Sequence, residues 1–170
     1  MQRQSANLYQ DTRQKRCNGS LTMLKVPFEL KPYPSPHHSP KPVMSVVFAN
    51  PSDESKKFPS ICLLDSGADF CTLPLSAQLR LGLDLKKMNV AKVPMSCACG
   101  NKTFFGYKFK VNVTIYDMEG KPFTNLLWVL FAKSDTMPLI GRNLMDIFEN
   151  MSYNNTERKD YFLGLREEEL

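Results

Sequence analysis

The 170-residue sequence contains no apolar run that approaches the roughly 18 residues needed for a membrane-spanning helix. Residues 1–16 also lack the apolar stretch of a signal peptide, so we expect a soluble protein of the cytoplasm with no membrane partner. Its five cysteines are too few and too irregularly spaced for a disulfide framework, and the odd number would leave one unpaired. In this setting we expect the thiols to stay reduced.

Histidine is scarce as well, because the only two are adjacent, at positions 37 and 38 in a proline-rich segment. The absence of His-Glu-x-x-His and Gly-x-Ser-x-Gly motifs disfavours zinc and serine hydrolases, and no phosphate-binding glycine loop is present. The pair in Cys97-Ala98-Cys99 invites a metal or redox role, but zinc sites usually combine two such pairs or add histidines. We therefore expect no metal and no cofactor.

The composition is that of a globular protein, with 42% hydrophobic and 23% charged residues. A net charge of +5 is modest and does not by itself call for a nucleic-acid partner. We expect residues 1–42 to be a disordered or extended Pro-rich basic tail and linker, in which 24–30 could add an edge strand. One domain then covers 43–165, and a short acidic tail covers 166–170.

Short β-branched and apolar stretches between turn signals predict a mostly-β domain, either barrel-like or a sandwich. The expected strands are residues 43–48, 58–64, 89–97, 103–116, 123–132, 151–153 and 161–165. A hairpin with its tip near 97–101 joins the third strand to the fourth, and 117–120 form the next turn. Short helices are expected at 74–81, ending near Gly82, and at 141–149.

The chemistry concentrates where the apolar stretch 61–64 runs into Asp65-Ser66-Gly67. A carboxylate beside a buried strand loses hydration, and a sequence accepts this cost for a partnered charge or for function. Gly67 allows a tight turn whose backbone N–H groups point back at the carboxylate, and Ser66 can add a side-chain hydrogen bond. On the tripeptide alone, an ordinary aspartate in a turn explains the pattern at least as well.

The context favours function, because two separate blocks resemble one family. The stretch from Leu63-Leu64-Asp65-Ser66-Gly67-Ala68 through Asp69 to 72–74 resembles the active-site loop of the retropepsin-like aspartic proteases. Residues 137–145, with Gly141-Arg142-Asn143, resemble the family's late element, in which a strand crosses behind that loop and enters a helix. The resemblance covers about 43–165 and implies a closed β-barrel with a flap hairpin and one or two short helices, one lobe per chain.

The resemblance also assigns roles to individual residues. The catalytic loop would be Asp65, Ser66 and Gly67; the substrate-binding residues would be Ala68, Asp69, Cys97, Ala98, Cys99 and Gly100; the structural supports would be Arg142 and Asn143. A bidentate pair between Arg142 and Asp69 would pin the loop to the second helix. The hairpin would close over the substrate as a flap, although its tip departs from the glycine-rich viral pattern by having a single glycine, Gly100.

Aspartic-protease chemistry requires two carboxylates that share one proton, and this chain has one Asp-Ser/Thr-Gly. The resemblance therefore implies a C2 homodimer in which Asp65 meets its symmetry mate. The expected function is an aspartic endopeptidase acting on peptides or polyproteins, with a retrotransposon-type polyprotein as one candidate substrate.

Two other functions remain open at this point. The first is a catalytically silent module of the same fold that serves dimerisation or peptide binding. The second is a nucleic-acid-binding β-barrel, because residues 102–110 interleave lysines with aromatic residues. The same alternation also describes an amphipathic flap strand, so a nucleic-acid partner is the less favoured of the two.

Overall fold

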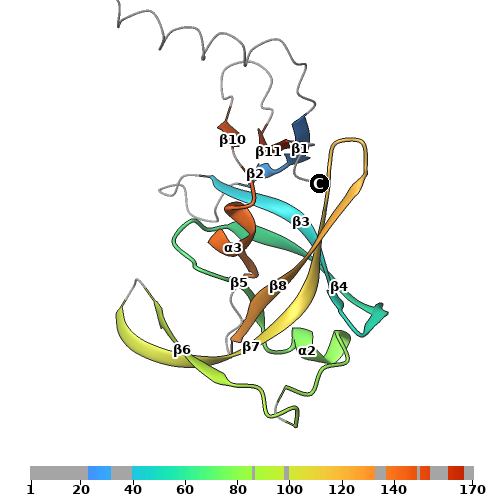
Figure 1. The fold of residues 1–170 in the computed structure, drawn as a ribbon. Coiled ribbons are helices and arrows are strands. Elements are labelled where there is room, and N and C mark those ends of the chain that lie inside the picture. Colours follow the sequence, from blue (N-terminus) through green and yellow to red (C-terminus); the bar gives the residue numbers. More distant parts are fainter. Residues whose placement is uncertain are drawn as a thin grey trace, which may run out of the picture.

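The computed structural model describes residues 23–31, 40–85, 87–97, 100–132, 137–148, 150–153 and 161–166 (Figure 1). Within these ranges nearly all regular structure is β-strand, and the helices α2 and α3 span four residues each, so the predicted mostly-β fold is confirmed. In chain order the elements are β1 (Met23–Pro27), β2 (Glu29–Lys31), β3 (Lys41–Asn50), β4 (Asp53–Leu64), β5 (Cys71–Pro74), α2 (Ala77–Arg80), β6 (Lys92–Cys97), β7 (Gly100–Tyr116), β8 (Pro122–Ala132), β9 (Leu139–Ile140), α3 (Arg142–Met145), β10 (Asn150–Tyr153) and β11 (Tyr161–Arg166).

The strands form two sheets. The smaller has the order β1-β11-β10 and lies at the opposite end of the molecule from α2 (Figure 1). The larger has the order β2-β3-β4-β9-β5-β8-β7-β6, and β3 makes an additional pairing with β7. The short strand β9 lies between β4, with which it is parallel, and β5. The segments before and after Asp65 are therefore held on either side of one strand from the C-terminal part of the chain.

Both predicted turns are present. Strands β6 and β7 pair antiparallel, from Lys92 opposite Tyr107 to Cys97 opposite Gly100, which confirms the hairpin. In the turn between β7 and β8, the carboxylate of Asp117 accepts hydrogen bonds from the N–H groups of Glu119 and Lys121 at 2.9 and 2.7 Å.

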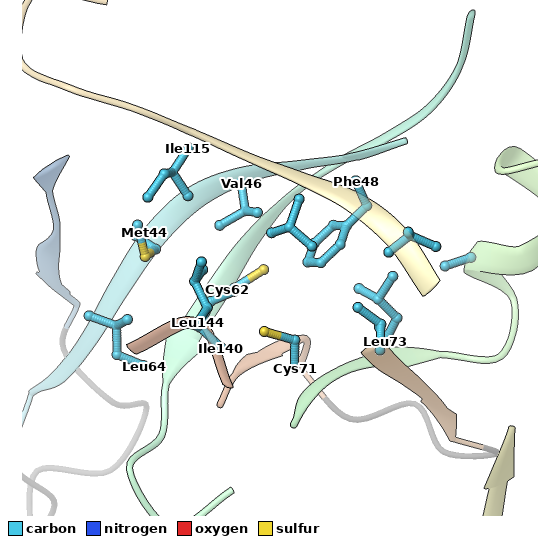
Figure 2. Close-up of a cluster of buried hydrophobic side chains, with 14 of the residues drawn as sticks. Met44, Val46, Phe48, Cys62, Leu64, Cys71, Leu73, Ile115, Ile140 and Leu144 are labelled. Carbon is cyan, nitrogen blue, oxygen red and sulfur yellow. The ribbon is translucent and has the colours of Figure 1, made fainter. Parts of the chain in front are cut away.

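One hydrophobic core draws residues from both sheets and both helices, and Figure 2 shows part of it. Phe48, Ile115 and Leu144 are fully buried there although they come from three distant parts of the chain. Cys62 and Cys71 point into the same core as free thiols and fill it as small apolar side chains. Burial raises the pKa of Cys62 to about 12 and that of Cys71 to about 11.

Strand β8 is less buried than its apolar sequence suggests. Its first half alternates exposed and partly buried residues, and only its last four, 129–132, are buried throughout. Over those four residues β8 pairs with β5 on one side and β7 on the other, whereas residues 122–128 pair with β7 alone. Leu126 and Trp128 are consequently left half exposed.

Both helices are shorter than predicted. Helix α2 begins at Ala77 because the chain pairs with β8 until the N–H of Leu75 bonds the carbonyl of Ala132 at 2.8 Å. Its predicted end is confirmed, since Gly82 has φ +62° and the N–H of Leu83 bonds the carbonyl of Gln78 at 2.8 Å. Helix α3 ends at Met145 and continues as tighter turns to the buried Phe148.

The segment 24–30 does contribute strand residues, split between β1 and β2. Strand β1 pairs with β11 and β2 pairs with β3, and Val26 and Phe28 are buried in the core. The adjacent histidines at 37 and 38 lie outside the described residues, and the domain boundaries themselves stay a prediction. In the described part of the chain, neither helix has the length or the apolar character needed to cross a membrane.

Candidate active site

The loop at residues 65–70, here called the Asp65 loop, begins where the buried strand β4 ends. The N–H of Asp65 donates to the carbonyl of Ile140 in β9 at 2.9 Å, which fixes the start of the loop against the core. The N–H of Gly67 donates to Asp65 Oδ1 at 2.9 Å, and the N–H of Ala68 donates to the Asp65 carbonyl at 3.1 Å. The predicted turn, with a backbone N–H aimed back at the carboxylate, is therefore present.

The Asp65 side of this turn faces partly toward solvent. Asp65 is half-buried, whereas Ser66 and Gly67 are exposed. Among the described residues the Ser66 hydroxyl has no hydrogen-bond partner, so backbone groups rather than this side chain hold the turn. One oxygen of the Asp65 carboxylate accepts the Gly67 N–H, and the side chain is partly exposed to solvent.

The second sequence block crosses directly behind the Asp65 loop. The carbonyl of Ala68 accepts the N–H of Arg142 at 2.8 Å, and the carbonyl of Asp69 accepts the N–H of Asn143 at 3.2 Å. A Cβ atom on Gly141 would lie 2.4 Å from the carbonyl carbon of Phe70 and 2.8 Å from the carbonyl oxygen of Ala68. Glycine is therefore the residue that lets these two backbones meet.

Two side chains of α3 tie down the far end of the loop. Arg142 forms the predicted ion pair with Asp69, but through the single contact of Nη2 with Oδ1 rather than the bidentate geometry expected. This hydrogen bond raises the pKa of the guanidinium, and both side chains are more than half exposed. Asn143 accepts the N–H of Cys71 at 2.8 Å and donates to the carbonyl of Trp128 at 2.8 Å. Asn143 thus links β5 to β8 immediately after the loop.

The other predicted substrate-binding residues are in the β6–β7 hairpin. Cys97 and Gly100 are the last paired residues of its two strands. Ala98 and Cys99 lie outside the described residues, so their predicted role stays a prediction, as do the roles of the other residues assigned from the sequence. Within the described chain, no group of three or more His, Cys, Asp or Glu side chains is arranged to hold a metal ion.

Sequence reasoning missed two aromatic residues of this region, Phe70 in the loop and Trp128 in β8. Lys108 Nζ lies 4.0 Å from the ring centroid of Phe70 and 5.3 Å from that of Trp128. Lys110 is directly opposite Trp128 in the β7–β8 pairing and also lies over its ring, at 5.2 Å. The lysines interleaved with aromatic residues along 102–110 pointed to this face of β7, but Phe70 and Trp128, which also form the face, are distant from that segment in the sequence.

Comparison with known proteins bears on the fold. No protein-family model matches the sequence, and no curated protein matches it. Among solved structures, the chain is similar to the crystal structure of a retropepsin-like aspartic protease from Rickettsia conorii, with 15% identity, a TM-score of 0.54, and coverage of 86% of this chain and 94% of that one. The chain has the retropepsin-like fold. A structure of EIAV protease complexed with the inhibitor HBY-793 also matches, at 21% identity over 68% of this chain and 91% of that chain, with a TM-score of 0.36.

The retropepsin-like fold is what the two sequence blocks implied. At 15% identity the likeness concerns the backbone. The chemistry must therefore be argued from the residues of this chain.

Proposed function

We propose that the chain is an aspartic endopeptidase that acts as a homodimer. The observation that carries the proposal is Asp65 itself: a half-buried carboxylate at the end of a core strand, held by Ile140 and Gly67, in a retropepsin-like fold. The proposal has three further parts: the large sheet closes into a barrel, the β6–β7 hairpin acts as a flap, and this lobe pairs with a second copy of the chain.

The chemistry follows from two Asp65 carboxylates that share one proton. The ionised carboxylate takes a proton from a water as the water oxygen attacks the scissile carbonyl carbon, while the protonated one gives its proton to the carbonyl oxygen. The tetrahedral diol then collapses: the C–N bond breaks, the nitrogen takes the proton from the carboxylate that deprotonated the water, and the other, now ionised carboxylate accepts a hydroxyl proton. The dyad returns to its starting state without a covalent intermediate.

The substrate would be an extended peptide bound between the β6–β7 hairpin and the Asp65 loop through main-chain hydrogen bonds and side-chain pockets. A retrotransposon-type polyprotein is the larger substrate proposed from the sequence resemblance. The catalytically silent module remains the competing function, and it differs in one respect only, which is turnover.

The experiment compares the wild type with Asp65→Asn on a peptide library, with and without a pepstatin-like inhibitor. We expect cleavage on the acid side of neutrality, since the shared proton must be retained, and we expect its loss in Asp65→Asn and with the inhibitor. Asp117→Asn is the matched control, because it makes the same change in a turn remote from the loop. Turnover that survives in a clean Asp65→Asn preparation would refute the assignment; no turnover in the wild type would favour the silent module.

A further inference from the structure

A groove of about 560 Å³ crosses the face of the large sheet where β6, β7 and β8 adjoin. Its lining residues are Val90, Ala91, Val93, Lys108, Phe109, Lys110 and Trp128. They include the chain's single tryptophan, 44% exposed, and no acidic residue. The exposed part of this aromatic side chain, together with the apolar lining, offers contact area to a bound ligand.

The charge in the groove has one sign. Among the described residues neither Lys108 nor Lys110 forms an ion pair, and both ammonium groups instead lie over the ring of Trp128. Lys92, which pairs with Tyr107 and lies over its ring at 5.9 Å from the centroid, is on the other face of the β6–β7 ladder and does not line the groove. A ligand for this surface must therefore bring negative charge.

The remaining lining indicates what kind of anion fits. The aliphatic side chains of Val90, Ala91 and Val93 give one wall of the groove an apolar surface. A nucleic acid would bind by stacking bases on an open aromatic face, but the face of Trp128 is shared by two lysines. A peptide that alternates carboxylate and aliphatic side chains matches both the cations and the apolar wall.

The groove is joined to the Asp65 loop. Lys108, which lines it, also contacts the ring of Phe70, five residues after Asp65. The carbonyl of Trp128 accepts the side-chain amide of Asn143, which in turn holds the N–H of Cys71 at the end of the loop. A polypeptide bound in the groove would therefore lie beside the loop on which we place the chemistry.

We infer that this groove binds an acidic stretch of the polypeptide substrate, alongside the scissile segment. The inference rests on the proposed function in one respect, which is that the bound polypeptide is a substrate. The binding itself does not require turnover. Carboxylates would pair with Lys108 and Lys110, whose ammonium groups lie over Trp128. An aliphatic side chain would pack on the wall formed by Val90, Ala91 and Val93. The preferred substrate class is then a protein with acidic, apolar residues flanking its cleavage site.

The test measures binding in the full-length Asp65→Asn protein, so that cleavage cannot interfere. The probe is a fluorescein-labelled peptide of alternating Glu and Leu, compared by fluorescence anisotropy with the same peptide carrying Gln for Glu. We expect the Glu peptide to bind more tightly, with an affinity that falls as salt is added. Adding Lys108→Gln and Lys110→Gln together should weaken binding about three- to tenfold. Adding Trp128→Ala instead should also weaken it, because the ring holds both ammonium groups in place.

The matched control carries Lys57→Gln and Lys121→Gln, which remove the same charge from exposed positions outside the groove. It should bind the Glu peptide as the parent does, and thermal melting should verify that every variant is folded. Equal binding of the Glu and Gln peptides, or unchanged binding in the Lys108/Lys110 variant, would overturn the inference. So would an oligothymidylate that displaces the peptide and depends on the same lysines. If the groove binds the Glu peptide but the wild type cleaves no peptide, the binding of acidic peptides stands and the proposed protease function is refuted.

Discussion

Gly141 shows how closely single residues are constrained around the Asp65 loop. Replacing it by alanine would place a Cβ atom 2.4 and 2.5 Å from the carbonyl carbon and oxygen of Phe70, and backbone atoms cannot turn aside. We expect Gly141→Ala to lower the free energy of unfolding by about 2–3 kcal/mol or more and to displace the loop. Urea denaturation measures the loss, and peptide cleavage measures the displacement.

Gly120→Ala is the control for this substitution. Its Cβ would meet nothing within 4 Å, so the only penalty is its φ of +81°, about 1–2 kcal/mol. Cleavage by this variant should match the wild type. Equal stability losses in the two glycine variants would contradict the steric account of Gly141.

The buried thiols predict how stability depends on pH. Cys62 and Cys71 have pKa values near 12 and 11 in the folded chain against an ordinary 9.0. Both thiols therefore stay protonated to a higher pH in the folded state than in the unfolded state. Their contribution is complete below about pH 9 and is lost as the pH rises toward 11 or 12. When the pH is raised from about 8 to about 10, the free energy of unfolding of the wild type should fall by roughly 2–3 kcal/mol more than that of a Cys62→Ala/Cys71→Ala variant.

Urea denaturation of both proteins at the two pH values measures this difference, and lysine and tyrosine titrations, which both proteins share, cancel in the comparison. Parallel losses in the two proteins would mean that these thiols do not stay neutral in the folded core.

At the scale of elements, α3 holds the Asp65 loop through two side chains that we expect to contribute unequally to stability. Asn143 satisfies the N–H of Cys71, a fully buried residue, so Asn143→Ala would leave that donor without a partner at a cost of about 1–3 kcal/mol. The Arg142 and Asp69 side chains are 55% and 67% exposed, so water and salt screen their ion pair. We expect Asn143→Ala to lower the melting temperature by more than Arg142→Ala does.

Salt supplies a second readout for the same elements. The stability difference between the wild type and Arg142→Ala should shrink at high salt, while the difference for Asn143→Ala should not. The reverse order of melting temperatures would show that the ion pair, rather than the amide bridge, fixes the loop.

The elements also show which parts of the fold can be predicted from the sequence. Strand β3 and the β6–β7 hairpin follow local patterns, alternating or β-branched, and were predicted within a few residues. The helices were predicted too long, because the pairing of Leu75 with Ala132 delays the start of α2 and is a contact between residues distant in sequence. Asp65 was found from its neighbours along the chain, whereas Trp128 was missed because it joins the site only through β7 and Asn143.

At the scale of the whole molecule, one chain carries a single Asp-Ser-Gly loop in a fold that is similar to that of an aspartic protease. Two carboxylates are needed to hold one proton between them, so the proposed activity belongs to a pair of chains. Dilution should therefore lower the specific activity once the chains separate, as gel filtration at the same concentrations would register.

Subunit mixing tests this arrangement directly. If each active centre needs two Asp65 carboxylates, adding an equal amount of Asp65→Asn to a fixed amount of wild type places half of the wild-type chains in mixed dimers. Cleavage should then fall to about half. Adding Asp117→Asn should instead increase cleavage in proportion, because that subunit keeps Asp65 and changes a carboxylate in a remote turn. Cleavage that stays constant as Asp65→Asn is added would mean that each chain acts alone, because a monomeric enzyme has no partner through which an inactive copy can reduce its rate.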